Sequence, residues 1–282
     1  MILEIFDVEH GACALITTSN GKRVMIDCGD NSTTGWKPDV ELIARGIWSI
    51  EKLIVSNYDE DHASGFPDLN RHIRIGAIVG NMSVSPADIR FLKSDDGMST
   101  GIAHLVHALE HDFANVAPFD GDFGDTSFAF FRNTPGIPPF GFDDENNLSL
   151  VTFVNCGAHR FIFPGDIEKE GWRALLKNPL VMSYLSRVTF FVASHHGRVN
   201  GYLKEVMDLC PNIRAVIISD KKIGYQSQET VDDYRRHTTG CLMGDDTVRH
   251  VFTTRRDGYM CFRVPPGSNW AYIMLEEALA KV

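Results

Sequence analysis

One ten-residue segment concentrates side chains that could do chemistry. It reads SNYDEDHASG over residues 56–65 and directly follows a short apolar strand. Because side chains alternate along an extended chain, Asn57, Asp59 and Asp61 point to one side. His62 adds an imidazole, and this mixture of oxygen and nitrogen donors is typical of a divalent metal site. An acidic solvated turn is the competing interpretation.

Two further strand-like runs end in metal-binding residue types. Residues 159–164 lead into Gly165-Asp166, and residues 187–193 lead into Ser194-His195-His196-Gly197. Asp166 could also cap the next helix, and paired histidines are sometimes only structural. One imidazole of such a pair can bind metal while the other donates a hydrogen bond or contacts substrate. Because ligands collect outside the carboxyl ends of strands, we expect the three loops to surround one cation.

The reaction that such a site favours is hydrolysis by a metal-bound hydroxide, since a divalent cation lowers the pKa of its water. Asp61 or Asp59 would orient or deprotonate that water. The leaving group would take a proton from the spare histidine, written here as His195, or from Tyr225. His10 is a second substrate-binding candidate, although a structural histidine explains it equally well.

The elements that must position these residues alternate between strands and helices. Strands are predicted at residues 1–8, 13–18, 23–27, 52–56, 74–80, 127–132, 148–154, 159–164, 187–193, 213–219, 248–254 and 258–264. Helices are predicted near residues 38–46, 62–70, 98–112, 167–177, 199–210, 228–237 and 274–282. Early hairpins and later β-α-β units indicate an α/β (α+β) fold with mixed sheets. Without a linker or repeat, residues 1–282 are expected to form one domain.

Composition narrows the function. The chain has 282 residues, is 44% hydrophobic and carries a formal net charge of −10, which argues against a wide nucleic-acid surface but not against a nuclease. No apolar run is long enough to span a membrane, and acidic residues interrupt the N-terminal segment, so we expect a cytoplasmic protein without membrane contact. The six scattered cysteines favour buried thiols over disulfides. The oligomeric state stays open.

Five motifs, in order, resemble those of metallo-β-lactamase-fold hydrolases. The 57–62 segment is a variant of their HxHxDH signature, and Asp27 lies in a first motif that supports the metal loop. The similarity is greatest to the soluble hydrolase domain of bacterial DNA-uptake (competence, ComEC-like) proteins. The matching segments are DVEHG at 7–11, NYDEDH at 57–62, ENNLSLV at 145–151, GDIE at 165–168 and HHG at 195–197.

This resemblance implies a fold, a metal and a bond type. The fold would be the αββα sandwich, two mixed β-sheets flanked by helices. Asp61, His62 and one of His195 and His196 would form one metal site, with Asp166 bridging to a second site. That second site would consist of Asn57, Asp59 and Asn147, where the family often has histidines. Amide oxygens bind zinc weakly, so one firmly held ion and a looser second one are expected, zinc or manganese, with magnesium as a further option.

Three functions are compatible with these residues and with the resemblance. A phosphodiester in a nucleic acid or a nucleotide is the leading hypothesis, and it rests on family analogy. A lactone, thioester or amide hydrolase of the same fold is the second. The third is a catalytically weakened member that acts as a binding or regulatory module, for which Asn57 and Asn147 are the supporting observation.

Overall fold

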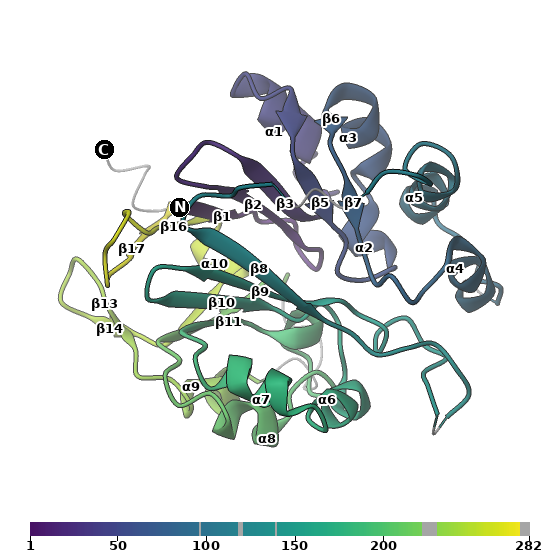
Figure 1. Ribbon diagram of the computed structural model, residues 1–282. Coiled ribbons are helices and arrows are strands. Elements are labelled where there is room, and N and C mark those ends of the chain that lie inside the picture. The colour runs from purple at the N-terminus through teal and green to yellow at the C-terminus, as the bar shows by residue number, and fades with distance from the viewer. Residues whose placement is uncertain (96, 118–120, 139, 222–229, 277–282) are drawn as a thin grey trace.

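A computed structural model describes residues 1–95, 97–117, 121–138, 140–221 and 230–276 of the chain. Two β-sheets stack face to face, and helices cover both outer faces (Figure 1). The αββα sandwich and the mixed sheets expected from the sequence are therefore confirmed. This arrangement brings loops from both sheets to one edge of the molecule.

The first sheet includes the strand Lys52–Ile54, which precedes the loop with Asp61 and His62. Its order is β17-β16-β1-β2-β3-β5-β7. The strands are β1 (Ile2–Ile5), β2 (Cys13–Thr17), β3 (Arg23–Cys28), β5 (Lys52–Ile54), β7 (Ile78–Val79), β16 (Met260–Arg263) and β17 (Tyr272–Leu275). Gly21, at φ +82°, makes the predicted turn between β2 and β3. Because β3, β5 and β7 run parallel, their carboxyl ends share one edge.

The second sheet has the order β15-β12-β11-β10-β9-β8. Its strands are β8 (Thr126–Phe131), β9 (Val151–Cys156), β10 (His159–Phe163), β11 (Phe190–Val192), β12 (Ala215–Ile218) and β15 (Val251–Thr253). The last four of these strands are parallel. Two short ribbons pair β4 (Ser49–Ile50) with β6 (Arg74–Ile75) and β13 (Cys241–Leu242) with β14 (Val248–Arg249).

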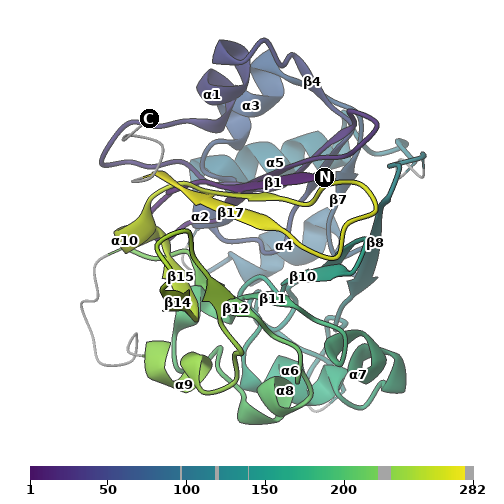
Figure 2. The same ribbon diagram turned by 90° about the vertical axis from the view of Figure 1, so that its left-hand side faces the viewer.

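Helices enclose the two sheets from opposite sides (Figures 1 and 2). Beside the first sheet lie α1 (Pro38–Ala44), α2 (Glu60–Ala63), α3 (Phe66–His72), α4 (Pro86–Leu92) and α5 (Thr100–Glu110). Beside the second lie α6 (Lys169–Leu175), α7 (Pro179–Leu185), α8 (Lys204–Asp208) and α9 (Val231–Arg235). The short α10 (Thr254–Asp257) joins β15 to β16.

Alternation along the strands fills three apolar layers. In β10, Phe161 packs between the sheets, whereas the next residue, Ile162, packs under the helices of the second sheet. Phe161 stacks on Phe190 with ring centroids 4.7 Å apart, and Phe262 meets both rings edge-on. Burying each such ring contributes about 1.5–3 kcal/mol, so this layer ties the two sheets together.

Several expectations need correction or comment. Residues 274 and 275, where a helix was expected to begin, instead belong to β17, because residues 272–275 pair with β16; residues 277–282 of the expected helix lie outside the described residues. Helices α4 and α7 were not predicted. All six cysteines are free thiols, as expected. Among the described residues, no helix combines the length and the apolar composition that crossing a bilayer requires.

Candidate metal centre

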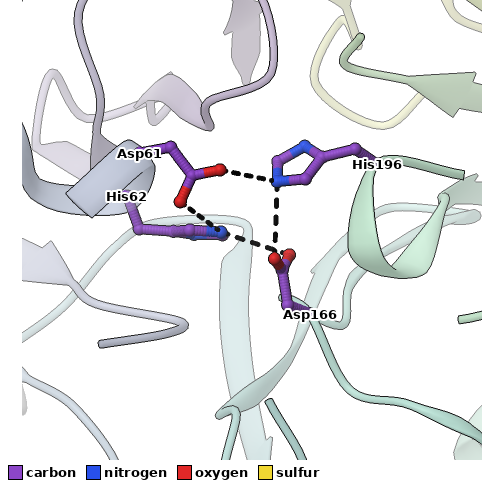
Figure 3. Close-up of side chains that lie close together, drawn as sticks. All are labelled: Asp61, His62, Asp166 and His196. Atoms are coloured by element: carbon purple, nitrogen blue, oxygen red, sulfur yellow. Dashed lines mark ion pairs between the residues drawn. The ribbon is translucent and has the colours of Figure 1, made fainter. Parts of the chain in front are cut away.

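Three loops meet at the carboxyl ends of parallel strands. The loop after β5 carries Asp61 and His62 at the start of α2, the loop after β10 carries Asp166, and the 3₁₀ turn Ser194–Gly197 after β11 carries His196. The first loop belongs to one sheet and the other two belong to the second. The predicted convergence of these four residues is present in the structure (Figure 3).

The four side chains form a compact set of donors. One potential ligand atom from each residue lies within 4.8 Å of the others. His62 Nε2 is 3.1 Å from Asp166 Oδ1, and His196 Nε2 is 3.3 Å from Asp61 Oδ2 and 3.5 Å from Asp166 Oδ2. His62, Asp166 and His196 are buried, while Asp61 is partly accessible. We call Asp61, His62, Asp166 and His196 the histidine half of the site.

Hydrogen bonds behind the two imidazoles fix which nitrogen faces the centre. His62 Nδ1 lies 3.0 Å from Asp27 Oδ2, and His196 Nδ1 lies 3.1 Å from the carbonyl oxygen of Ser219. When each Nδ1 donates its proton outward, each Nε2 presents a lone pair inward. Both Nε2 atoms are buried and make no hydrogen bond. Unpartnered buried nitrogens facing two carboxylates fit a divalent cation, because the cation would satisfy all four groups.

The pKa values of the histidines and of Asp166 show that opposite charges face one another in the centre. Burial alone would lower the pKa of His196, but Asp166 and Asp61 outweigh it and raise that pKa to about 10. His62 behaves alike, with Asp166 and Asp27 raising its pKa well above the usual value against burial. Burial would raise the pKa of Asp166, yet His196 and His62 hold it well below its usual range. The carboxylates of Asp27, Asp61 and Asp166 therefore stabilise positive charge in the centre, whether it comes from protons or from a metal ion.

The backbone at this site is held in unusual conformations. Among the described residues, five that are not glycine have positive φ, and four of them belong to segments of the site: Glu9, Asp27 near the end of β3, His195 and His196. Left-handed backbone costs about 1–2 kcal/mol for such residues, so it persists where surrounding contacts impose it. In the case of Asp27, both carboxylate oxygens bind Ser56, at its N–H (2.7 Å) and its hydroxyl (2.5 Å).

At Gly11 and Gly29, the backbone approaches the metal loop so closely that a side chain would not fit. A Cβ atom on Gly11 would lie 2.5 Å from the carbonyl oxygen of Asp61, and one on Gly29 would lie 2.3 Å from it. The same oxygen accepts a hydrogen bond from the N–H of Ala12. Close packing of three backbone segments therefore locks the metal loop, and only glycine leaves the room.

His195 lies beside the centre rather than in it. Its Nε2 is 3.9 Å from Asp166 Oδ2 and accepts a hydrogen bond from Arg198 Nη1 at 2.9 Å. Its Nδ1 is 3.2 Å from Glu168 Oε1, though without hydrogen-bond geometry. Burial, Arg198 and His196 lower the pKa of His195, while Asp166 opposes them. A neutral His195 therefore orients Arg198, and its predicted catalytic role stays a prediction.

His10 occupies the rim of the site. It is partly buried, and its Nδ1 is shielded from solvent without a hydrogen-bond partner. Burial lowers its pKa, and the charges on His196 and Arg198 lower it further. This position suits the predicted contact with substrate. Tyr225, the other predicted substrate residue, lies outside the described residues.

The predicted second metal site is arranged differently. Lys93, which follows α4, donates to Asp59 and also to Glu145 Oε1 at 2.8 Å. Asn57 donates to Asn146 Oδ1 at 3.0 Å, and its own Oδ1 is buried without a partner. We call Asn57, Asp59, Lys93 and Glu145 the lysine half of the site. An ammonium group satisfies its carboxylates, so Asp59 is not brought into the histidine half.

Asn147 has a structural task in this geometry. Its Oδ1 accepts hydrogen bonds from the N–H groups of Gly171 (2.8 Å) and Glu168 (3.2 Å), and its Nδ2 donates to Asp144. Both lone pairs of the amide oxygen are therefore used at the beginning of α6. The structure thus gives Asn147 no free atom for a metal ion, contrary to its predicted place in a second metal site.

Sequence reasoning missed the side chains and backbone groups that surround the ligands. Lys93 lies 34 positions after Asp59 without a motif of its own. Ser219 contributes a carbonyl oxygen, which every residue type possesses. Arg198 directly follows the HHG motif, and its position there was the available signal.

Comparisons with known proteins agree with this architecture. Residues 6–98 match the sequence model of the metallo-beta-lactamase superfamily. Over 277 residues the chain is 22% identical to ComE operon protein 3 of Bacillus subtilis (strain 168), covering 90% of this chain and 33% of that protein. The chain thus spans about a third of the length of the curated relative it matches.

Solved structures with similar folds have low sequence identity. CmlA, a diiron β-hydroxylase from Streptomyces venezuelae, is 12% identical with a TM-score of 0.50, covering 93% of this chain and 54% of CmlA. A diphosphatase of the PhnP family is 10% identical with a TM-score of 0.45, covering 94% of this chain and 99% of that one. The matched segment and the αββα fold are therefore similar to those of the metallo-β-lactamase superfamily.

Proposed function

We propose that this protein is a metal-dependent hydrolase that cleaves a phosphodiester of a nucleic acid or a nucleotide. One zinc or manganese ion would be held by Asp61, His62, Asp166 and His196. The observation that carries the proposal is the pair of buried, unpartnered Nε2 atoms facing two carboxylates. Two imidazoles and two carboxylates suit zinc and manganese better than magnesium, which prefers oxygen ligands and retained waters.

A divalent cation in this set would lower the pKa of a bound water and polarise the scissile group. The residues of the chain supply the rest. Asp27 and the Ser219 carbonyl hold the imidazoles in their ligating tautomers. Asp61, the most accessible of the four ligands, would accept a hydrogen bond from the attacking water. Arg198 and His10 lie at the rim, where Arg198 would bind a phosphate oxygen of the substrate.

The phosphodiester is supported by the five motifs shared with the hydrolase domain of DNA-uptake proteins, and by the cationic rim residue Arg198. A lactone, thioester or amide hydrolase would use the same ligands, so the substrate has to be tested directly. A binding or regulatory module is favoured by one observation, namely that Lys93 closes the lysine half of the site. We propose a single-ion enzyme, because the histidine half keeps its full donor set.

The test combines metal analysis with substrate probes. Purified protein is loaded with Mn²⁺ or Zn²⁺, its metal content is measured, and turnover of bis-p-nitrophenyl phosphate is compared with turnover of lactone and β-lactam probes. We expect about one ion per chain and turnover of the phosphodiester that chelator removes. An Asp61→Ala, His62→Ala double variant that kept both metal and activity would contradict the assignment. A chain without stoichiometric metal and without stabilisation by Mn²⁺ or Zn²⁺ would instead support the binding module.

A further inference from the structure

A second polar cavity lies at the opposite end of the second sheet. Arg160 is in β10, Arg187 precedes β11, and Arg214 directly precedes β12. These three strands are parallel, so their amino ends lie together, away from the carboxyl ends that build the metal centre (Figure 2). The cavity measures about 450 Å³, within the range of small-molecule sites.

The lining of this cavity has one sign of charge. Besides the three arginines, the polar lining residues are Thr189, Asn212 and Thr239. Among the described residues, no carboxylate lines it, although acidic residues outnumber basic ones by 37 to 27 in the whole chain. In the part of the chain that the structure describes, none of the three guanidinium groups has a carboxylate oxygen within 4.0 Å. Three unneutralised cations in one hollow produce a local positive potential in an acidic protein.

Contacts with neutral groups hold two of these guanidinium groups in place. Arg160 Nη1 donates to the carbonyl oxygens of Gly157 (2.9 Å) and His159 (3.0 Å). Arg187 Nε donates to the carbonyl of Ser183, and its guanidinium lies 5.0 Å from the ring centre of Tyr184. Each guanidinium has five N–H donors, so most donors of both remain available to a ligand.

The positive field is felt by neighbouring groups. Burial lowers the pKa of Arg160, and the charge of Arg187 lowers it further. Burial also lowers the pKa of the fully buried His159, with Arg214 and Arg160 adding to the effect. Like charges brought this close repel one another, and an anion bound among them would relieve that repulsion.

We infer that Arg160, Arg187 and Arg214 form an anion-binding site for a phosphate group, carried by a nucleotide or another small phosphorylated molecule. Planar guanidinium groups bind phosphate oxygens in pairs. Arg160 lies near the amino end of β10, whereas Asp166 follows the carboxyl end of that strand at Phe163, so this ligand is distinct from a small substrate at the metal centre. The inference does not depend on the proposed hydrolase activity.

The test is calorimetric titration of the full, manganese-loaded chain with adenosine monophosphate, and separately with a ten-nucleotide single-stranded DNA. The test variant is Arg187→Gln, Arg214→Gln, at two exposed positions. The matched control is Arg71→Gln, Arg236→Gln, which removes the same charge from exposed arginines that pair with Asp68 and Asp233. Melting temperatures check that every variant is folded, and Asp61→Asn reports binding at the metal centre.

We expect the affinity for adenosine monophosphate to fall at least about tenfold in the test variant, and to change less than about twofold in the control. The Asp61→Asn chain should keep this binding. If the test variant loses affinity for the DNA but not for adenosine monophosphate, the bound phosphate belongs to a polynucleotide, and the small-molecule ligand is excluded. The inference is overturned if neither probe binds the unmodified chain, if the control loses as much affinity as the test variant, or if Asp61→Asn alone abolishes binding.

Discussion

The two halves of the metal centre handle crowded carboxylates in different ways. In the histidine half, two carboxylates face two Nε2 atoms that make no hydrogen bond with the described residues. In the lysine half, the Lys93 ammonium lies between Asp59 and Glu145 and satisfies both. The histidine half can take its positive charge from protons or from a metal ion, whereas the lysine half takes its positive charge from Lys93.

This difference teaches that a ligand-like sequence motif does not define a ligand. Asp59 and Asp61 are two residues apart in the same segment, yet Asp61 faces the histidines and Asp59 faces Lys93. The two aspartates differ because the fold brings Lys93 to Asp59 and His196 to Asp61. The comparison leads to the expectation of one ion per chain, held in the histidine half.

Removing a ligand from the histidine half should have the largest effect. Asp166→Ala deletes the carboxylate that contacts both imidazoles, so we expect loss of stoichiometric metal and a fall in activity on the order of 10³-fold. The measurements are metal content and turnover of the phosphodiester probe. Asp143→Ala, at an exposed aspartate without an ion pair among the described residues, is the control. Full metal content in Asp166→Ala would remove the distinction between the halves.

The support behind His62 should matter next. Asp27→Asn keeps the size of the side chain and tolerates the left-handed backbone at φ +56°, but it removes the charge beside His62 Nδ1. We expect metal affinity to fall about 10- to 100-fold with the fold intact. Competition with a calibrated chelator measures the affinity, and circular dichroism checks the fold. An unchanged affinity would show that Asp27 only packs.

Metal binding should depend on pH, because protons and metal compete for the histidine half. The pKa of His196 is about 10 without metal, so at neutral pH its imidazole carries a proton that the cation must displace. The affinity should therefore rise about tenfold per pH unit for each proton released. Calorimetry in buffers of different ionisation enthalpy counts those protons, and a pH-independent affinity contradicts the assignment.

The free energy of unfolding of the metal-free chain should fall as pH rises, whereas the metal affinity rises. The folded pKa of His196 exceeds its ordinary value of 6.5, so the stabilising contribution is complete below about pH 6.5. It is lost as pH rises towards about 10. Denaturant midpoints measured across this window, with and without metal, separate the two effects.

Lys93→Met tests the lysine half directly. The variant keeps the aliphatic stem but leaves two part-buried carboxylates without their cation, which should cost about 1–3 kcal/mol of unfolding free energy. Freed of Lys93, Asp59 and Glu145 should take up a second ion at high Mn²⁺ concentration. Metal stoichiometry and denaturant unfolding measure both effects. If the stoichiometry stays at one in Lys93→Met, the ammonium is not what closes this half.

Asn147→Ala should have the smallest effect. Losing the hydrogen bonds to the N–H groups of Gly171 and Glu168 should lower stability by about 1–2 kcal/mol and leave the metal content unchanged. Asn155→Ala, which removes a part-exposed amide that bonds only Ser127, is the matched control. A fall in metal affinity in Asn147→Ala alone would restore the predicted ligand role.

Much of the fold was predictable because local signals agreed with it. The strand ends predicted that Asp61, His62, Asp166 and one of His195 and His196 lie at one edge, whereas alternation wrongly predicted that Asp59 and Asp61 share a side. Helix α4 also had a readable signal, since Ser85 and Asp88 form a capping box around Pro86. Residues 272–275 read YIML, a short run of large side chains whose periodicity does not separate a strand from a helix, and pairing with β16 makes it a strand.

The rest of the site depends on contacts that sequence spacing does not encode. Asn147 has the right residue type for an oxygen ligand, but whether its oxygen faces a metal or the beginning of α6 is a matter of orientation. Lys93 becomes relevant only because α4 packs beside the metal loop. Which histidine of the pair faces the centre follows from the Ser219 carbonyl, which lies 23 residues away.

The donors of the histidine half are contributed at widely separated times during synthesis of the chain. Asp61 and His62 leave the ribosome about a hundred residues before Asp166 and His196, and they belong to the other sheet. A nascent chain therefore cannot offer a cation more than two ligands until both sheets exist and have docked. Metal capture would come last in maturation, and holding the ion would report that assembly of the sandwich is complete.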